Sequence, residues 1–291
     1  MNGWTTMKLL IEKIDNNFKN LNVDGIILAL KDLSIQSIKY YSIDEIKSIK
    51  EEYPNLEIFI KINKNIMNKD LDLLKESLIE LDKLNINGVF FYDLAFLQLK
   101  KELNLSIDLV WDQTHMVNNY KTCDYYNSLG VKYALLSKEI TLNEIKTIIE
   151  KSKITSMVEV VSVPSIAFSK RKLLTSYFKN INKELKEEIE VIEKVSNNKY
   201  IVMEDNNGTS FYDSNIVNCT SLIKDLYEMN CPYIIMREYK IPKFDELVND
   251  TKEYIDNKCI DTKYIDKYKV LGDNTNFFYK ETIYRVKKNE K

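Results

Sequence analysis

Histidine is almost absent from this chain of 291 residues, in which His115 is the single example. Any Ser-His-Asp, Cys-His or two-histidine metal scheme would have to use that residue. The sequence also contains neither an H-E-x-x-H nor a G-x-S-x-G motif. It therefore contains no recognisable protease machinery and predicts no metal site.

Cysteine is scarce and scattered, because Cys123, Cys219, Cys231 and Cys259 lie far apart with no C-x-x-C spacing. This distribution argues against a zinc knuckle and against a disulfide framework. Four scattered cysteines also form a poor Cys₄ set for an iron-sulfur cluster. We expect reduced, buried thiols, no iron-sulfur cluster and no other bound cofactor.

Long apolar runs are absent too. The longest, such as residues 25–30 and 89–92, are far shorter than the roughly 18 to 20 residues of a membrane span. Residues 1–10 lack the basic segment, apolar stretch and cleavage site of a signal peptide. We therefore expect a cytoplasmic protein that does not associate with membranes.

An excess of charge of either sign is absent, because 42 Lys and Arg residues nearly balance 44 Asp and Glu residues, for a formal net charge of −2. The chain as a whole should not attract nucleic acid, so any RNA contact must come from a local basic patch or from a partner protein. We expect no DNA partner. Two basic clusters are candidates, although a solvated surface would explain either: Lys170, Arg171, Lys172, Lys179, Lys183 and Lys186, and then Lys280, Arg285, Lys287, Lys288 and Lys291.

Short β-branched and aromatic runs alternate with amphipathic stretches, which indicates βαβ units and a parallel sheet. The predicted strands are residues 25–30, 56–62, 88–92, 106–111, 133–137, 157–161 and 233–236. Ser42 with Glu45 and Thr141 with Glu144 have the spacing of capping boxes at helix starts. A repeat of about 25 to 30 residues without a GxGxxG turn favours a TIM-like α/β barrel.

The alternation is interrupted after residue 189. Runs at 191–195, 200–204 and 209–212, separated by Asn-rich turns, predict an antiparallel β-hairpin insertion. We therefore expect the first six β/α units in residues 1–189, the insertion in 190–218, the remaining units in 219–258 and a C-terminal tail in 259–291.

In such a barrel, reactive groups stand at the C-terminal ends of the strands. The residues at those ends are Asn63, Asp93, Trp111 with Asp112, Lys138 with Glu139, and Glu159. Glu159 and Glu139 are the candidate catalytic carboxylates, since carboxylates suit proton transfer.

A second group of candidates follows the strand that bears Glu159: Ser169, Lys170, Arg171 and Tyr177. A guanidinium beside hydroxyl groups suits an anionic ligand, because it pairs bidentately with carboxylate or phosphate. A basic cap on a surface helix is an equally good interpretation.

Four segments carry a family resemblance: the strand with Glu159 leading into SKRKLLTSYF, WDQTHMVNNYKTCDYYNSLGVKYALLSKEI, MEDNNGTSFYDS and FFYKETIYRVK. They occur in order along nearly the whole chain and are similar to the collagenase-like U peptidases, the thirty-second peptidase family of unassigned catalytic type. The chain resembles its short branch, which is tied to tRNA hydroxylation.

The resemblance implies participation in 5-hydroxyuridine formation at the wobble position of tRNA, together with a longer paralogue. It also implies a prephenate-like co-substrate, with Arg171 as the natural partner of one carboxylate. Lys172-Leu173 stands where many relatives have their first cluster cysteine, and Ser210 stands where the family usually has histidine. Such departures leave open whether the chain is itself a catalyst. The alternatives are a peptidase, and a non-catalytic subunit that serves as a scaffold or binds RNA.

Overall fold

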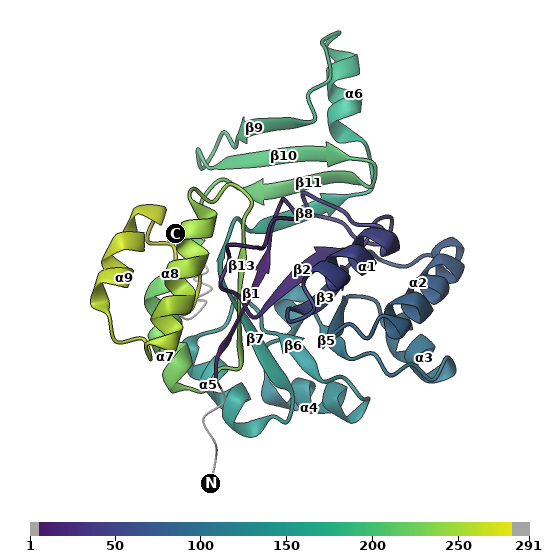
Figure 1. Ribbon diagram of the computed structural model, residues 1–291. Coiled ribbons are helices and arrows are strands. Elements are labelled where there is room, and N and C mark those ends of the chain that lie inside the picture. Colours follow the sequence, from purple (N-terminus) through teal and green to yellow (C-terminus); the bar gives the residue numbers. More distant parts are fainter. Residues whose placement is uncertain (1–5, 281–291) are drawn as a thin grey trace, which may run out of the picture.

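Eight parallel strands form a closed barrel in the computed structural model, which describes residues 6–280 (Figure 1). The predicted TIM-like barrel is therefore confirmed. The strands are, in order around the barrel, β1 (Lys8–Glu12), β2 (Gly25–Ala29), β3 (Glu57–Ile62), β4 (Gly88–Phe91), β5 (Leu109–Trp111), β6 (Tyr133–Leu135), β7 (Thr155–Ser162) and β13 (Tyr233–Arg237), which pairs back with β1.

The strand that closes the barrel, β1, is absent from the strands predicted from the sequence. It pairs in parallel with both β2 and β13. Its three central residues, Leu9, Leu10 and Ile11, are completely buried. Because no helical stretch precedes it, this run of five residues has no βα periodicity that would mark it as a strand.

Helices surround the barrel (Figure 1). They are α1 (Ile43–Glu52), α2 (Leu71–Lys83), α3 (Ala95–Glu102), α4 (Tyr120–Ser128), α5 (Leu142–Lys151), α7 (Ile223–Glu228), α8 (Phe244–Asp256) and α9 (Thr262–Tyr268), with short 3-10 turns η1 (Asn68–Asp70), η2 (Thr114–Met116), η3 (Thr220–Leu222) and η4 (Lys269–Leu271). Both predicted capping boxes are present at the starts of α1 and α5. No helix among residues 6–280 has the length and apolarity to cross a membrane.

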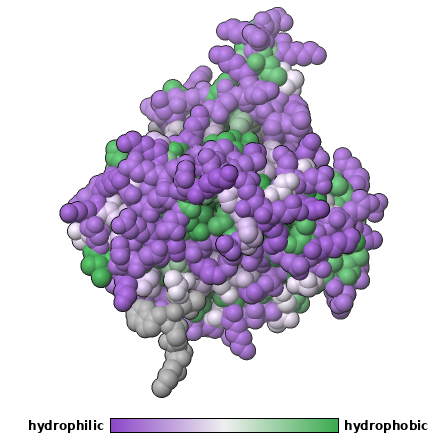
Figure 2. Space-filling view, viewed as in Figure 1, coloured by the Kyte–Doolittle hydropathy of each residue, from purple (hydrophilic) through white to green (hydrophobic). Residues whose placement is uncertain are grey.

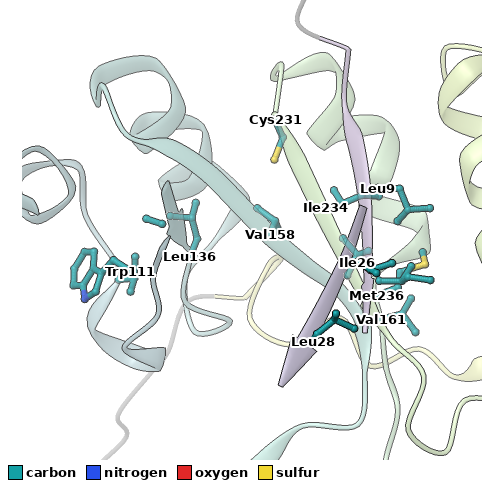
Figure 3. Close-up of a cluster of buried hydrophobic side chains, with 14 of the residues drawn as sticks. Leu9, Ile26, Leu28, Trp111, Leu136, Val158, Val161, Cys231, Ile234 and Met236 are labelled. Atoms are coloured by element: carbon teal, nitrogen blue, oxygen red, sulfur yellow. The ribbon is translucent and has the colours of Figure 1, made fainter. Parts of the chain in front are cut away.

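The apolar core has two layers. The outer layer lies between strands and helices and includes Leu9, Ile26 and Ile234, which lie on neighbouring strands (Figure 3). The inner layer fills the barrel itself, where Phe59 makes edge-to-face contacts with Phe90 at 6.0 Å and Tyr133 at 5.7 Å between ring centroids. Side chains therefore fill the barrel interior at this layer, and a ligand can enter only from the C-terminal ends of the strands.

An antiparallel sheet is inserted between β7 and α7. Its strand order is β8 (Ser165–Ser169), β11 (Gly208–Asp213), β10 (Lys199–Asp205) and β9 (Glu188–Ile192), and α6 (Leu173–Asn180) packs on it through Leu174 and Phe178. The predicted runs at 200–204 and 209–212 lie within β10 and β11, whereas the run at 191–195 overlaps β9 only at residues 191 and 192. The strand β8 was not predicted, and β12 (Val217–Asn218) returns the chain to the barrel beside β7.

The inserted sheet is fastened to the loops at the C-terminal end of the barrel (Figure 1). The hydroxyl of Tyr40, after β2, donates to Asp205 at 2.7 Å, and the hydroxyl of Tyr239, after β13, donates to Glu188 at 3.0 Å. The end of the described chain also returns to this side, where residues 276–279 form a turn. Residues 281–291, the last part of the predicted C-terminal tail, lie outside the described residues.

Candidate functional site at the barrel mouth

A cavity of about 450 Å³ lies at the C-terminal ends of the barrel strands. Residues 36–39 and Tyr41, after β2, form part of its wall. Residues 164–166 and Tyr212 come from the inserted segment, and Asn276 and Phe277 come from the returning end of the chain. Segments far apart in the sequence therefore enclose one space, at the end of the barrel where this fold places its ligands.

The floor of the cavity is a ring of mostly charged residues. Each stands two positions after an apolar residue of the inner layer, so that strand alternation directs both into the barrel. The ring consists of Glu12, Ala29, Lys61, Asp112, Ser137, Glu159 and Arg237, which follow Leu10, Ile27, Phe59, Val110, Leu135, Met157 and Ile235. Seven of the eight strands contribute to it.

Arg237 connects two of the carboxylates in this ring. Its Nε atom donates to Oε2 of Glu159 at 2.7 Å, and its Nη1 atom pairs with Glu12 from the neighbouring strand β1. Lys138 forms an ion pair with the other oxygen of Glu159. Burial lowers the pKa of Arg237 to about 10. Glu159, only 3% exposed, is thus neutralised by two cations and serves to hold the ring together.

Lys61 belongs to a hydrogen-bonded chain that ends at Glu12, with which it also forms an ion pair at 3.5 Å. Its ammonium donates to Ser37 Oγ at 2.8 Å and to the carbonyl of Gln36 at 3.0 Å. The Ser37 hydroxyl donates in turn to Glu12 at 3.0 Å. Burial lowers the pKa of Lys61 to about 8, although the charges of Asp112 and Glu159 oppose the shift.

Asp112 is the carboxylate best suited to proton transfer. Burial raises the pKa of its carboxyl above the usual range, although the charge of Lys61 opposes this effect. Unlike Glu12 and Glu159, it forms no ion pair within 4.0 Å among residues 6–280. A carboxyl with a raised pKa in a cavity is a candidate general acid or base.

Three polar groups of the cavity wall are buried without a hydrogen-bond partner among the described residues. They are the hydroxyls of Tyr41 and Tyr212 and the amide nitrogen of Asn276. Leaving such groups unsatisfied costs about 1 to 3 kcal/mol each. A bound ligand with its own donors and acceptors would remove that cost.

The structure brings five of the residues read from the strand ends to the cavity: Asn63, Asp112, Lys138, Glu139 and Glu159. Asn63 accepts a hydrogen bond from the backbone N–H of Ile35 at 2.9 Å, which fixes the loop after β2. Glu139 is exposed at the rim. Of the two candidate catalytic carboxylates, one is therefore inside the ring of ions and the other stands at the edge.

Trp111 and Asp93 lie outside the cavity lining. Trp111 is completely buried between barrel and helices, where it stacks on Tyr126 with ring centroids 3.9 Å apart. Asp93 accepts hydrogen bonds from the backbone N–H groups of Ile66 at 3.1 Å and Ala95 at 2.9 Å. Both have clear structural contacts, in the core and at the start of α3 respectively.

Ser169, Lys170, Arg171 and Tyr177 also lie outside the lining, where the inserted sheet leads into α6. Ser169 Oγ accepts from the backbone N–H of Arg171 at 3.2 Å, which shapes the turn before the helix. The side chains of Lys170 and Arg171 are exposed, as is Tyr177. These four residues therefore form a surface separate from the cavity.

Histidine and cysteine do not form a nucleophilic pair. His115 is exposed at the cavity rim, with Nδ1 3.2 Å from Thr114 Oγ1. All four cysteines are buried, and burial raises the pKa of each thiol to about 12. Among residues 6–280, no three His, Cys, Asp or Glu side chains are grouped so as to hold a metal ion.

Comparisons with known proteins place the chain in a family. The chain is 25% identical over 254 residues to a Bacillus subtilis protein named tRNA hydroxylation protein P2, covering 78% of this chain and 81% of that protein. It is 29% identical over 162 residues to an uncharacterized protease of Methanocaldococcus jannaschii, covering 53% and 39% respectively.

Among solved structures, the 3-hexulose-6-phosphate synthase of Salmonella typhimurium is similar, with a TM-score of 0.48, 11% identity and coverage of 87% of this chain and 100% of that chain. The family model for peptidase family U32 matches residues 18–232, which is well over half of the sequence. The chain belongs to peptidase family U32.

Proposed function

We propose that this protein takes part in the hydroxylation of tRNA, forming 5-hydroxyuridine at the wobble position, and that the barrel-mouth cavity is the site of that activity. The observation that carries the proposal is the ring of ionisable groups on the cavity floor. The similarity to tRNA hydroxylation protein P2 supports tRNA as the substrate class. The wobble uridine stands in a single-stranded loop, from which a base can be splayed out into a protein cavity.

The cavity has the size and the chemistry for a small ligand. Its volume of about 450 Å³ is within the range of about 300 to 1,000 Å³ usual for such sites. Lys61 and Lys138 provide positive charge, and the hydroxyls of Tyr41 and Tyr212 provide unused hydrogen-bonding capacity. A prephenate-like dicarboxylate co-substrate would bind to these groups rather than to Arg171, which lies outside the lining.

In this proposal Asp112 transfers a proton, since burial raises the pKa of its carboxyl above the usual range and so favours the protonated form. Glu159 and Arg237 position the ring by mutual ion pairing instead of contacting substrate. The activity belongs in the cytoplasm, with a longer paralogue as partner. A partner would also compensate for the weak overall attraction between tRNA and a chain of net charge −2.

The test is nucleoside analysis of tRNA from cells lacking the gene, complemented with variants. Wild type should restore 5-hydroxyuridine and Asp112→Asn should lower it by about tenfold or more, as loss of a general acid–base group does. Asp72→Asn is the matched control, because Asp72 is exposed in the first turn of α2. Unchanged 5-hydroxyuridine in the deletion strain would refute the proposal.

A further inference from the structure

We infer that α6, together with the turn before it and the segment that follows it, forms a docking surface for the phosphate backbone of RNA. This surface, the basic arm, consists of residues 170–186. The inference rests on the proposed function in taking tRNA as the RNA, and it goes further by locating the contact outside the cavity. Phosphate is the ligand that clustered lysine and arginine side chains recognise without regard to sequence.

The charge of the basic arm contrasts with the rest of the chain. Residues 170–186 contain six basic residues and one acid, Glu184, and so have a net charge of +5, whereas the whole chain has −2. All six basic residues are exposed. The remaining residues together have a net charge of −7, from −2 minus +5, so that long-range attraction would favour the approach of RNA to the arm.

The arrangement of α6 turns its basic residues outward. Leu174 and Phe178, one helical turn apart, are buried against Val202 of the sheet. Lys179, which is spaced for the opposite face of the helix, is exposed. Figure 2 shows the projecting part of the molecule as mainly hydrophilic. The helix therefore presents Lys179 to solvent instead of packing it, and the other exposed basic residues of the arm flank the helix.

The basic groups of the arm are available for a ligand. Among the described residues, Lys170, Arg171, Lys179, Lys183 and Lys186 form no ion pair within 4.0 Å, although the protein pairs many other lysines with carboxylates. Lys172 donates to a backbone carbonyl, that of Asp205. Tyr177, 53% exposed between these lysines, adds a ring on which a base can stack.

The position of the arm links it to the cavity. Strand β8 begins at Ser165, which lines the cavity, and ends at Ser169, directly before the arm. Five residues of extended chain span about 17 Å. RNA held on the arm would therefore lie within a few nucleotides of the cavity that is proposed to receive one base. The arm would supply affinity, and the cavity would supply the chemistry.

The test measures binding of bulk tRNA by the purified full chain over a range of salt concentrations. The arm variant combines Lys170→Gln, Lys179→Gln and Lys183→Gln. The control variant combines Lys47→Gln, Lys75→Gln and Lys101→Gln on α1, α2 and α3, where the lysines are also exposed and form no ion pair among the described residues. Both variants have the same net charge.

The arm variant should bind tRNA at least about tenfold more weakly, and its log–log salt dependence should become shallower by about 2, since each phosphate contact contributes about 0.7 to 0.9. The control variant should stay close to wild type. Equal losses in both variants, or an unchanged salt dependence in the arm variant, would overturn the inference.

Two further outcomes separate this inference from the proposed function. If the arm variant binds tRNA normally but no longer co-purifies with a protein that wild type retains, the arm is a protein-docking surface and the inference is wrong. If tRNA binding depends on the arm while deletion of the gene leaves 5-hydroxyuridine unchanged, the RNA surface stands and the proposed function fails.

Discussion

Arg237 Nε donates a 2.7 Å hydrogen bond to Glu159 Oε2 and thereby joins β13 to β7 across the floor of the cavity. Replacing Glu159 by glutamine would leave the buried guanidinium with Glu12 as its remaining carboxylate partner. Removing one member of a buried ion pair is strongly destabilising. We expect Glu159→Gln to lower the free energy of unfolding by about 3 kcal/mol, measured by urea denaturation.

Glu139→Gln is the control for this change. Glu139 lines the same cavity but is exposed, and its side chain forms no ion pair within 4.0 Å among residues 6–280. We expect its replacement to change stability by no more than about 0.5 kcal/mol. If the two glutamine variants are equally stable, Glu159 does not hold the ring together.

Lys61 should make stability depend on pH in the alkaline range. Its pKa is about 8 in the folded protein, against about 10.4 in an unfolded chain. Below pH 8 both states are protonated and the full cost of burying the charge is present. Between pH 8 and 10.4 the unfolded state binds more protons than the folded state, so this cost is regained as pH rises.

The measurement compares wild type with Lys61→Met by urea denaturation at pH 7 and pH 10. Groups common to both chains cancel in the difference. Relative to the variant, wild type should gain about 2 to 3 kcal/mol between these pH values. The compared quantity is the free energy of unfolding of wild type minus that of Lys61→Met. If this quantity is the same at both pH values, or falls as pH rises, the pKa of Lys61 is not lowered in the folded protein.

Replacing Trp111 should lower the stability of the protein without changing the activity proposed for the cavity. Trp111→Phe keeps an aromatic ring against Tyr126 but loses the 3.0 Å hydrogen bond from the indole to Gln113 Oε1. We expect a loss of about 1 to 2 kcal/mol and, in complemented cells, normal 5-hydroxyuridine. Normal stability combined with lost hydroxylation would instead place Trp111 in contact with the ligand.

The barrel could be predicted because local signals repeat along the chain. Apolar runs at regular spacing and the capping boxes at Ser42 and Thr141 marked most strands and helices. The strand β1 could not be recognised in this way, because it has no preceding helix. The order of β8 beside β11 depends on pairing across about 40 residues, for which the sequence contains no local signal.

The cavity was harder to predict than the fold. Listing polar residues after each strand found Asp112, Lys138 and Glu159 but also Asp93, whose carboxylate instead accepts backbone N–H groups. A better signal was the alternation within each strand, because Lys61 and Arg237 stand two positions after the buried Phe59 and Ile235. Using it requires knowing which face of each strand points into the barrel, and only barrel closure decides that.

Arg171 separates two interpretations of the segment after β8. A guanidinium that holds a planar carboxylate through two hydrogen bonds cannot be replaced by lysine, whereas a cation facing phosphate can. Because Arg171 is exposed on the basic arm and outside the cavity lining, we expect Arg171→Lys to keep tRNA affinity within about twofold. Arg171→Gln should weaken binding about fivefold at 0.15 M salt, the factor that one phosphate contact contributes.

Fluorescence anisotropy with labelled tRNA measures both variants, and hydroxylation in complemented cells should follow the same order. A lysine variant as impaired as the glutamine variant would return Arg171 to the role of a bidentate ligand for a carboxylate.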